Sequence, residues 1–251
     1  MGQLFDLVHL SYIVISLLVT TALLIAGKRL LIDDQGKQVY LKVFALLTFF
    51  LHTSVLWVDF LKNGSAMAPD NILFPIYFCN CSMYMLVIVA FWERRDSKWF
   101  RYFAIVTAYS GIFGALISLF YPAYYLGASS IFEWSVFKSM LSHSTMLVGC
   151  AWLLVGGFAP IRKDNALVYF VGLLGFGLIG LIVNGLFHAT GLNDPNAMYL
   201  QHPPLAEAPF LSAYTISALM VLLIYLFTLA YAAYKEKKLM GKNPVESRVT
   251  A

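Results

Sequence analysis

The stretch ILFPIYFCNCSMYMLVIVAFW, residues 72–92, decides the fold class of this chain. It contains no Asp, Glu, Lys or Arg and is about as long as the 20 or so apolar residues that a helix needs to cross a bilayer. It also carries a proline and the triplet Cys79-Asn80-Cys81, where a lipid-facing helix would place Leu, Ile or Val. The stretch therefore predicts a membrane helix that also contributes to a polar site.

Six further apolar runs resemble it in length, and 60% of the chain is apolar against 12% charged. This composition lies far outside the range of soluble globular proteins. The first run has no basic segment before it and no small-residue cleavage site after it, so we expect it to be retained. We predict an all-α, seven-helix transmembrane bundle over residues 1–234 and a basic cytoplasmic tail over 235–251. The other runs are 5–27, 39–61, 99–121, 132–158, 166–188 and 209–234.

The basic residues predict the orientation of this bundle, because Lys and Arg are retained on the cytoplasmic side of membranes. They gather in the odd-numbered loops and the tail, which puts the N-terminus outside and the C-terminus inside. We therefore expect a multi-pass membrane protein, in the cell membrane if the source is bacterial. The basic residues on the cytoplasmic side then explain the net charge of +4. We therefore expect no nucleic-acid partner. The second loop has at most Lys62. The basic residues of the odd-numbered loops and the tail are Lys28, Arg29, Lys37, Arg94, Arg95, Lys98, Arg162, Lys163, Lys235, Lys237, Lys238, Lys242 and Arg248.

Several chemistries have no support in the sequence. Cys79 and Cys81 project to different faces of one helix and Cys150 lies in another run, so we expect free thiols. No phosphate-binding glycine loop and no His-Glu-x-x-His motif occurs, and we expect no nucleotide, no other cofactor and no metal site. The run 209–234 contains no lysine, which excludes a retinal Schiff base.

Polar residues inside the apolar runs predict a pocket. Counted from the outer end of each helix, Cys79 and Asn80 lie about 10–13 Å deep, His52 about 14 Å, His143 about 17 Å and Asn184 about 6 Å. Intramembrane polar groups usually face a bundle interior or a wet cavity. We therefore expect an outward-facing pocket. The loop of residues 189–208 is long enough to cap it.

Structural roles compete with this interpretation. A cysteine in a membrane helix is often a small packing residue, His143 can hydrogen-bond between helices, and Asn184 can hold two helices together. Pro75 is most simply a residue in the first turn of the third span, where its missing N–H costs nothing.

From about residue 70 to the end of the seventh span, the chain resembles the bacterial YwaF-type integral membrane family, while the first two spans match it only in hydropathy. In that family the third span opens with Leu-Pro-Leu-His-Leu-Cys, which stands here as residues 74–79 with Tyr77 in place of the His. The resemblance rests on FPIYFCN, a Gly-Ala-Leu fourth span ending in Tyr121-Pro122, Ser142-His143, Asn184, TGLNDPNAMYL and Pro203-Pro204.

That family is similar in turn to the eukaryotic transmembrane-protein-164 acyltransferase, which moves a fatty acyl chain between phospholipids and is thought to use a cysteine. Its cysteine aligns with Ile76 and its downstream histidine with His143. Cys79 lies three positions after Ile76, about one helical turn along the same face. The resemblance implies acyl transfer on membrane phospholipids, with Cys79 and His143 as catalytic residues. The expected substrate-binding residues are Tyr77, Asn80, Asn184, Asn193 and His52.

Two other functions stay open. A non-catalytic protein that binds lipid or another small molecule would need the same pocket without turnover. A transporter is the other alternative, although all nine prolines fall in loops or at span ends, so no broken helix is indicated at the midplane. The oligomeric state is not indicated by the sequence.

Overall fold

The computed structural model describes residues 2–63, 74–191, 195–205 and 207–242. Every regular element in these ranges is helical, which confirms the all-α prediction for the part of the chain described. The elements are α1 (Leu7–Leu30), α2 (Asp34–Asn63), α4 (Phe78–Ala90), α5 (Lys98–Phe120), α6 (Trp134–Val155), α7 (Asn165–Thr190), the 3-10 turn η1 (Ala197–Tyr199) and α8 (Ala213–Lys242).

Among the described residues, four helices are long and apolar enough to cross a membrane: Leu7–Leu30, Lys98–Phe120, Asn165–Thr190 and Ala213–Lys238. The helices α2, α4 and α6 fall on the other three predicted runs but are not in this set, and α4 has only 13 residues. The number of spans, the sides on which the termini lie and the tail boundary at residue 234 therefore stay predictions. The helix α8 itself continues through Lys242.

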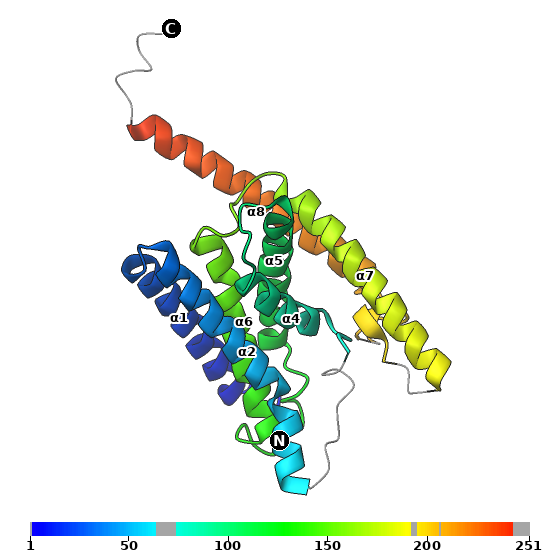
Figure 1. Ribbon diagram of the computed structural model, residues 1–251. Helices are drawn as coiled ribbons and strands as arrows, with labels where there is room; N and C mark the ends of the chain where they lie inside the picture. The colour runs from blue at the N-terminus through cyan, green and yellow to red at the C-terminus, as the bar shows by residue number, and fades with distance from the viewer. Residues whose placement is uncertain (1, 64–73, 192–194, 206, 243–251) are drawn as a thin grey trace.

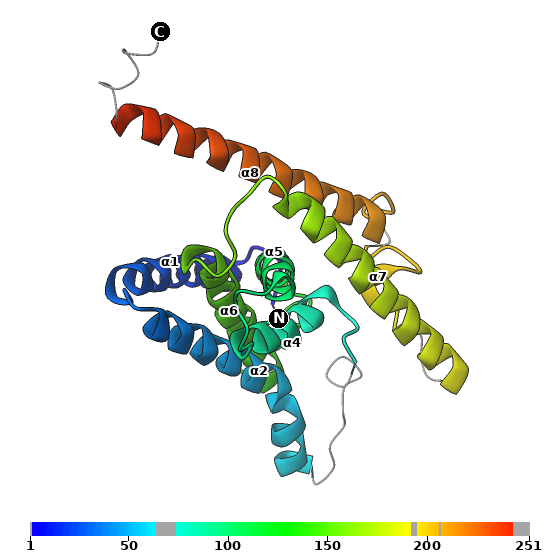
Figure 2. The same ribbon diagram turned by 45° about the horizontal axis from the view of Figure 1, so that its top comes forward.

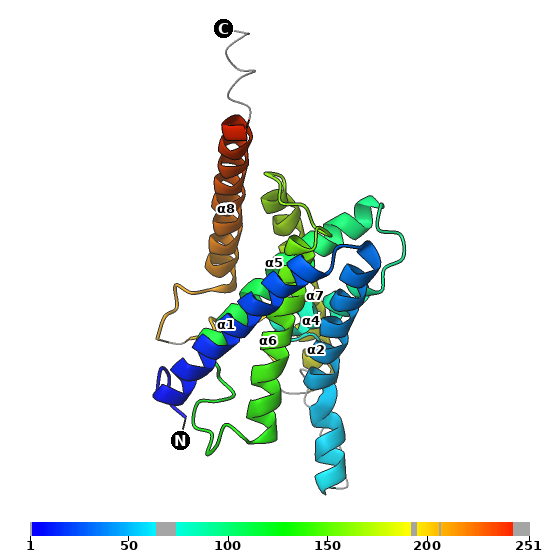
Figure 3. The same ribbon diagram turned by 90° about the vertical axis from the view of Figure 1, so that its left-hand side faces the viewer.

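The helices form a bundle with a separate pair beside it. The bundle contains α1, α2, α4, α5 and α6, and α6 contacts each of the other four. The helix α8 packs mainly on α7, and this pair lies to one side of the bundle (Figures 1 and 2). Figure 3 shows α1 crossing α6 on the face opposite to this pair. The helix α5 also contacts α7, which joins the pair to the bundle.

The core of the bundle surrounds α6. Trp152 is fully buried there, and its indole N–H donates to the backbone carbonyl of Lys37 at 3.1 Å. Leu41, Leu86 and Leu153 are also fully buried in the same cluster. Because lipid is as apolar as these side chains, close packing and hydrogen bonds hold the helices together more than burial from solvent does.

The chain before α1 is tied to the loop between α5 and α6. Asp6 caps α1 by accepting from the N–H of His9 at 2.8 Å, and the hydroxyl of Tyr125 donates to Asp6 at 2.7 Å. The N–H of Gly2 donates to the carbonyl of Ala128 at 2.9 Å. Hydrogen bonds from the backbone of Gln3 and His9, then from Tyr125, lower the pKa of the Asp6 carboxyl to about 2. These contacts fix the loop that precedes α6.

The helix α4 begins later than the sequence predicts. Residues 74–77 are not helical, Tyr77 has extended dihedral angles, and the helix starts at Phe78. The expectation that Pro75 lies in the first helical turn is therefore wrong. The physical reason is a tertiary hydrogen bond, because the carbonyl of Ile76 accepts from the N–H of Met198 at 2.8 Å instead of from its own helix. The depth count for Cys79 changes as a result, since this residue lies in the first turn of α4.

Candidate functional site

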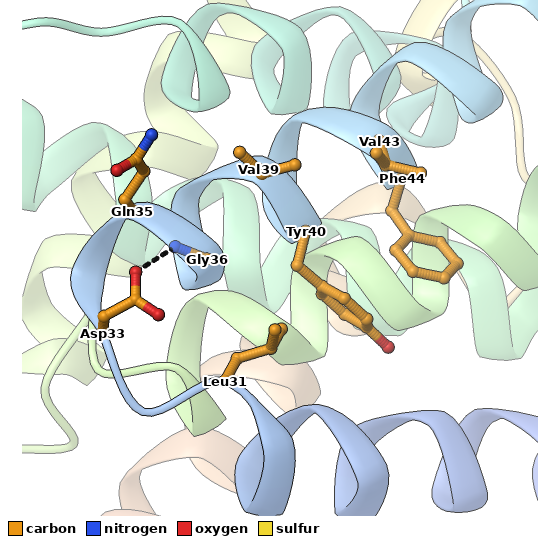
Figure 4. A pocket seen from close by; sticks show the side chains of 8 residues that line it. All are labelled: Leu31, Asp33, Gln35, Gly36, Val39, Tyr40, Val43 and Phe44. Atoms are coloured by element: carbon orange, nitrogen blue, oxygen red, sulfur yellow. Dashed lines mark hydrogen bonds between the residues drawn. The ribbon is translucent and has the colours of Figure 1, made fainter.

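A cavity of about 1670 Å³ lies between α4, α5 and α6 on one side and α7, α8 and the loop around η1 on the other. A smaller cavity of about 520 Å³ lies at the turn between α1 and α2 (Figure 4). It is lined largely by apolar side chains such as Val39 and Phe44, and its Asp33 carboxylate accepts from the N–H of Gly36 at 2.7 Å. Candidate chemistry is therefore concentrated in the larger cavity.

Most of the predicted site residues line this larger cavity. His52, Tyr77, Cys79, Asn80 and His143 are all in its wall. Asn184 is not among the lining residues, and Asn193 lies outside the described residues. Helices α2, α4 and α6, together with the residue just before α4, thus bring five of the seven predicted residues to one space.

The thiol of Cys79 sits at the N-terminus of α4 and is half-buried. Asn80 and Ser118 lie with it in the cavity wall, and Gly114 of α5 packs against it. Gly114 makes this approach possible, because a Cβ there would lie 3.2 Å from the Cβ of Cys79. The thiol therefore lies at a helix N-terminus and in the wall of the cavity.

One ring nitrogen of His143 is hydrogen-bonded within the protein, and the other has no hydrogen-bond partner among the described residues. Its Nδ1 lies 2.7 Å from the backbone carbonyl of Ser139, four residues earlier on α6. Because a carbonyl only accepts, Nδ1 carries the proton and Nε2 carries the lone pair. The buried Nε2 has no hydrogen-bond partner among the described residues. Tyr124 stacks on the ring, with centroids 5.8 Å apart, and donates its hydroxyl to the carbonyl of Ser118 at 3.2 Å.

Cys79 and His143 line the same cavity. Tyr124 stacks on His143 and donates its hydroxyl to the carbonyl of Ser118, and both Tyr124 and Ser118 are also in the cavity wall. A thiol from α4 and an imidazole from α6 therefore face one space.

Asn80 is oriented by hydrogen bonds on both sides of its amide. Its Oδ1 accepts from the N–H of Tyr77 at 3.0 Å, so its Nδ2 faces the Nε2 of His52 at 3.3 Å. An amide nitrogen only donates, so His52 accepts here. These contacts hold the Asn80 amide at the start of α4, beside the thiol.

Asn184 connects α7 to the loop around η1 through its side-chain amide. Its Oδ1 accepts from the N–H of Ala197 at 2.7 Å, and its Nδ2 donates to the carbonyl of the same residue at 3.3 Å. These two bonds fasten η1 to α7. Met198 and Tyr199, which follow, line the cavity. The described part of the loop thus lies over the cavity, where the sequence predicts a cap.

One protein-family model matches most of the chain. The model of the TMEM164 family matches residues 4–231. The chain belongs to the TMEM164 family. Comparison with the curated proteins and with the solved structures gave no match. Family membership together with four apolar helices supports a membrane protein. The similarity to the bacterial YwaF-type family stays a prediction.

Within the TMEM164 family member described here, the position aligned with the acyltransferase cysteine does not face the cavity. Ile76 is buried against Val183, Phe187 and Ala197, and it precedes α4. The expectation that Ile76 and Cys79 lie one turn apart on a helical face is therefore wrong. Cys79 is the cysteine of this segment that lines the cavity.

Sequence reasoning missed two side chains at this site. Ser118 and Tyr124 come from the end of α5 and the loop after it, and nothing in their local sequence distinguishes them from helix-end residues. Lys138 is a charged residue inside an apolar run, which made it a weaker candidate from the sequence than His143. The structure buries it in the cavity wall.

Proposed function

We propose that this TMEM164 family member transfers fatty acyl chains between membrane phospholipids through a thioester on Cys79. The observation that carries the proposal is the Nε2 atom of His143, which is buried without a hydrogen-bond partner among the described residues and shares a cavity with the Cys79 thiol. A nucleophile and a base at one site are the minimum for nucleophilic acyl transfer. The family resemblance supports the same assignment for His143.

The first half of the reaction forms the thioester. Nε2 of His143 takes the thiol proton as Sγ of Cys79 attacks the ester carbonyl carbon. The negative charge that develops on the carbonyl oxygen is stabilised by the Nδ2 amide of Asn80, which His52 and Tyr77 hold in place. The bond from carbon to the glycerol oxygen then breaks. His143 returns its proton to that oxygen, and a lysolipid leaves.

The second half regenerates the enzyme. The hydroxyl of a lysolipid acceptor gives its proton to Nε2 of His143 and attacks the thioester carbonyl. The carbon–sulfur bond breaks, and the proton passes to the departing sulfur of Cys79. Replacing the acceptor by water would give hydrolysis, so exclusion of water by the apolar wall of α7 and α8 favours transfer.

The position of Cys79 supports access to lipid esters. The ester groups of a bilayer lie near its surface, and Cys79 lies in the first turn of α4 and not deep inside a helix. We include in the proposal that the chain spans the membrane seven times, with the N-terminus outside and the cavity open to the outer leaflet. Phospholipids are then both donor and acceptor.

The test uses the full-length protein in detergent with an acyl-labelled phospholipid donor and an unlabelled lysolipid acceptor. Lipid mass spectrometry should show the label on the acceptor, and Cys79→Ala should reduce transfer to background. Cys81→Ala is the matched control, because Cys81 packs against Val106, Phe176 and Met198 and is not in the cavity wall. Equal activity in the two variants would contradict the proposal.

A second function is favoured by the apolar part of the cavity wall, which α7 and α8 supply. A non-catalytic lipid-binding protein would use the same wall and have no turnover. In that case wild-type protein would bind the labelled donor without moving its label, and Cys79→Ala would bind it equally well.

A further inference from the structure

The wall that α7 contributes to the large cavity is apolar. Leu167, Phe170, Leu174, Leu178 and Leu181 line it at intervals of three or four residues, so they share one face of the helix. All five side chains are exposed in the protein alone. An exposed apolar face of this kind either contacts bilayer lipid in general or holds a particular apolar ligand.

This wall is continuous with the Cys79 site. The ring of Phe176 packs edge-on against that of Phe78, with centroids 5.1 Å apart, and Phe78 directly precedes Cys79 on α4. Gly177 follows Phe176 on α7 and lines the cavity. The apolar face of α7 therefore runs past the end of α4 that carries the thiol.

The length of this wall matches one acyl chain. From Gly177 back to Leu167, α7 rises about 15 Å, and one leaflet of a bilayer core is also about 15 Å thick. The helix α8 supplies further apolar wall, including Val221. It is held beside α7 (Figure 2), where the hydroxyl of Tyr169 donates to the sulfur of Met220 at 3.4 Å. A chain of bilayer length thus fits between the thiol and Leu167.

Gly177 leaves open space in this wall. A Cβ there would meet no atom within 4 Å, whereas a Cβ at Gly180 would lie 2.8 Å from Leu200. Helix packing therefore requires a glycine at 180 but not at 177. Gly175 and Gly185 have the same open space but are not among the described residues of the cavity wall. What distinguishes Gly177 is that its missing side chain enlarges the cavity.

We propose that Gly177 determines the length of the acyl chain that the cavity accepts, with the chain lying along α7 from the Cys79 end toward Leu167. This inference rests on the proposed function, because the ester of that chain would then lie at Cys79. A bulky side chain at position 177 would occupy the path and leave room for the first part of a chain only. Gly177 is then a specificity-determining residue that takes no part in the chemistry.

A binding experiment tests this without any need for turnover. Full-length protein carrying Cys79→Ala is titrated in detergent with phosphatidylethanolamine that has a fluorescent headgroup and either palmitoyl or butanoyl chains. Adding Gly177→Leu should lower the preference for the palmitoyl lipid by about 10-fold or more, since withdrawing two methylenes from an apolar wall already corresponds to this factor. Gly177→Ala should shift the preference in the same direction by less. Retained butanoyl binding shows that the cavity is folded.

Gly175→Leu is the matched control, because Gly175 lies on the same helix, offers a side chain the same open space and is not among the described residues of the cavity wall. It should keep the wild-type preference. If both leucine variants behave alike, the α7 face contacts bilayer lipid in general and the inference fails. An equal loss for both lipids in Gly177→Leu would also overturn it, because chain length would then not matter.

A turnover arm separates this inference from the proposed function. With Cys79 intact, Gly177→Leu should raise KM for the palmitoyl donor more than for the butanoyl donor. If the binding arm gives the expected result while wild-type protein transfers no acyl chain, the role of Gly177 stands and the acyl-transfer proposal fails. If transfer occurs and Gly177→Leu keeps the wild-type chain preference, acyl transfer stands and the role of Gly177 fails.

Discussion

The Nδ1 atom of His143 lies 2.7 Å from the backbone carbonyl of Ser139. Both residues belong to α6, four positions apart, so the contact depends on one helical turn and not on a distant segment. It fixes the proton on Nδ1 and leaves Nε2 as a base in the cavity that Cys79 also lines.

His143→Ala should reduce acyl transfer by about 100- to 10,000-fold, which is the range for loss of a general base. Lipid mass spectrometry on purified protein measures the rate. His188→Ala is the control, because His188 is exposed in the last turn of α7 and lies outside the cavity wall. Full activity in His143→Ala would remove catalysis from this site.

Asn184→Ala should lower the stability of the protein by about 1–3 kcal/mol, because the N–H of Ala197 loses its partner and the carbonyl of Ala197 keeps only the N–H of Leu200. Thermal unfolding in detergent measures this change. Gly185→Ala is the neighbouring control, since a Cβ there meets nothing within 4 Å. If Asn184 instead touched substrate, the change would alter KM and leave the melting temperature unchanged.

The predicted topology can be tested across α5, one of the four candidate spans. Asp96→Cys, just before α5, and Ser129→Cys, in the loop beyond its C-terminal end, are both exposed. An impermeant thiol reagent should label Ser129→Cys from outside intact cells and should not label Asp96→Cys. The reverse pattern would place the N-terminus inside and turn the cavity to the other leaflet.

Asp6 gives a prediction about pH, because it lies just outside the candidate span Leu7–Leu30. Its pKa is lowered from 3.8 to about 2 by hydrogen bonds from Gln3, His9 and Tyr125. A depressed folded-state pKa means that the stabilisation is complete above 3.8 and is lost as the pH falls through 2. The stability gap between wild type and Asp6→Asn should therefore be constant from neutral pH to about pH 4 and close below it. A gap that persists at the lowest pH would show that the carboxylate charge is not responsible.

The helices were predictable because their apolar runs are long, but α6 is less apolar than the four candidate spans. Lys138, Ser139, Ser142 and His143 make α6 more polar, and these same residues form the site. The start of α4 was not predictable, since it depends on the hydrogen bond between Met198 and Ile76, which are far apart in sequence.

The candidate pair Cys79 and His143 could be found from sequence because each interrupts an apolar run. The assignment of Asn184 to substrate binding could not be separated from a packing role, because both place an amide inside a helix bundle. Tyr124 could not be found at all. Tyr124 lies beside His143 because of the conformation of the loop between α5 and α6. Hydrogen bonds from Gly2 to Ala128 and from Tyr125 to Asp6 hold this loop in position.

The most direct test of the account is the detection of the acyl-enzyme itself. Purified protein is incubated with a phospholipid donor in the absence of acceptor, quenched in acid and analysed by intact-protein and peptide mass spectrometry. A thioester on Cys79 predicts a mass increase of one acyl chain, located on Cys79, absent from Cys79→Ala, retained in Cys81→Ala and removed by neutral hydroxylamine. Acyl transfer without any adduct on Cys79, or an adduct that persists in Cys79→Ala, would contradict it.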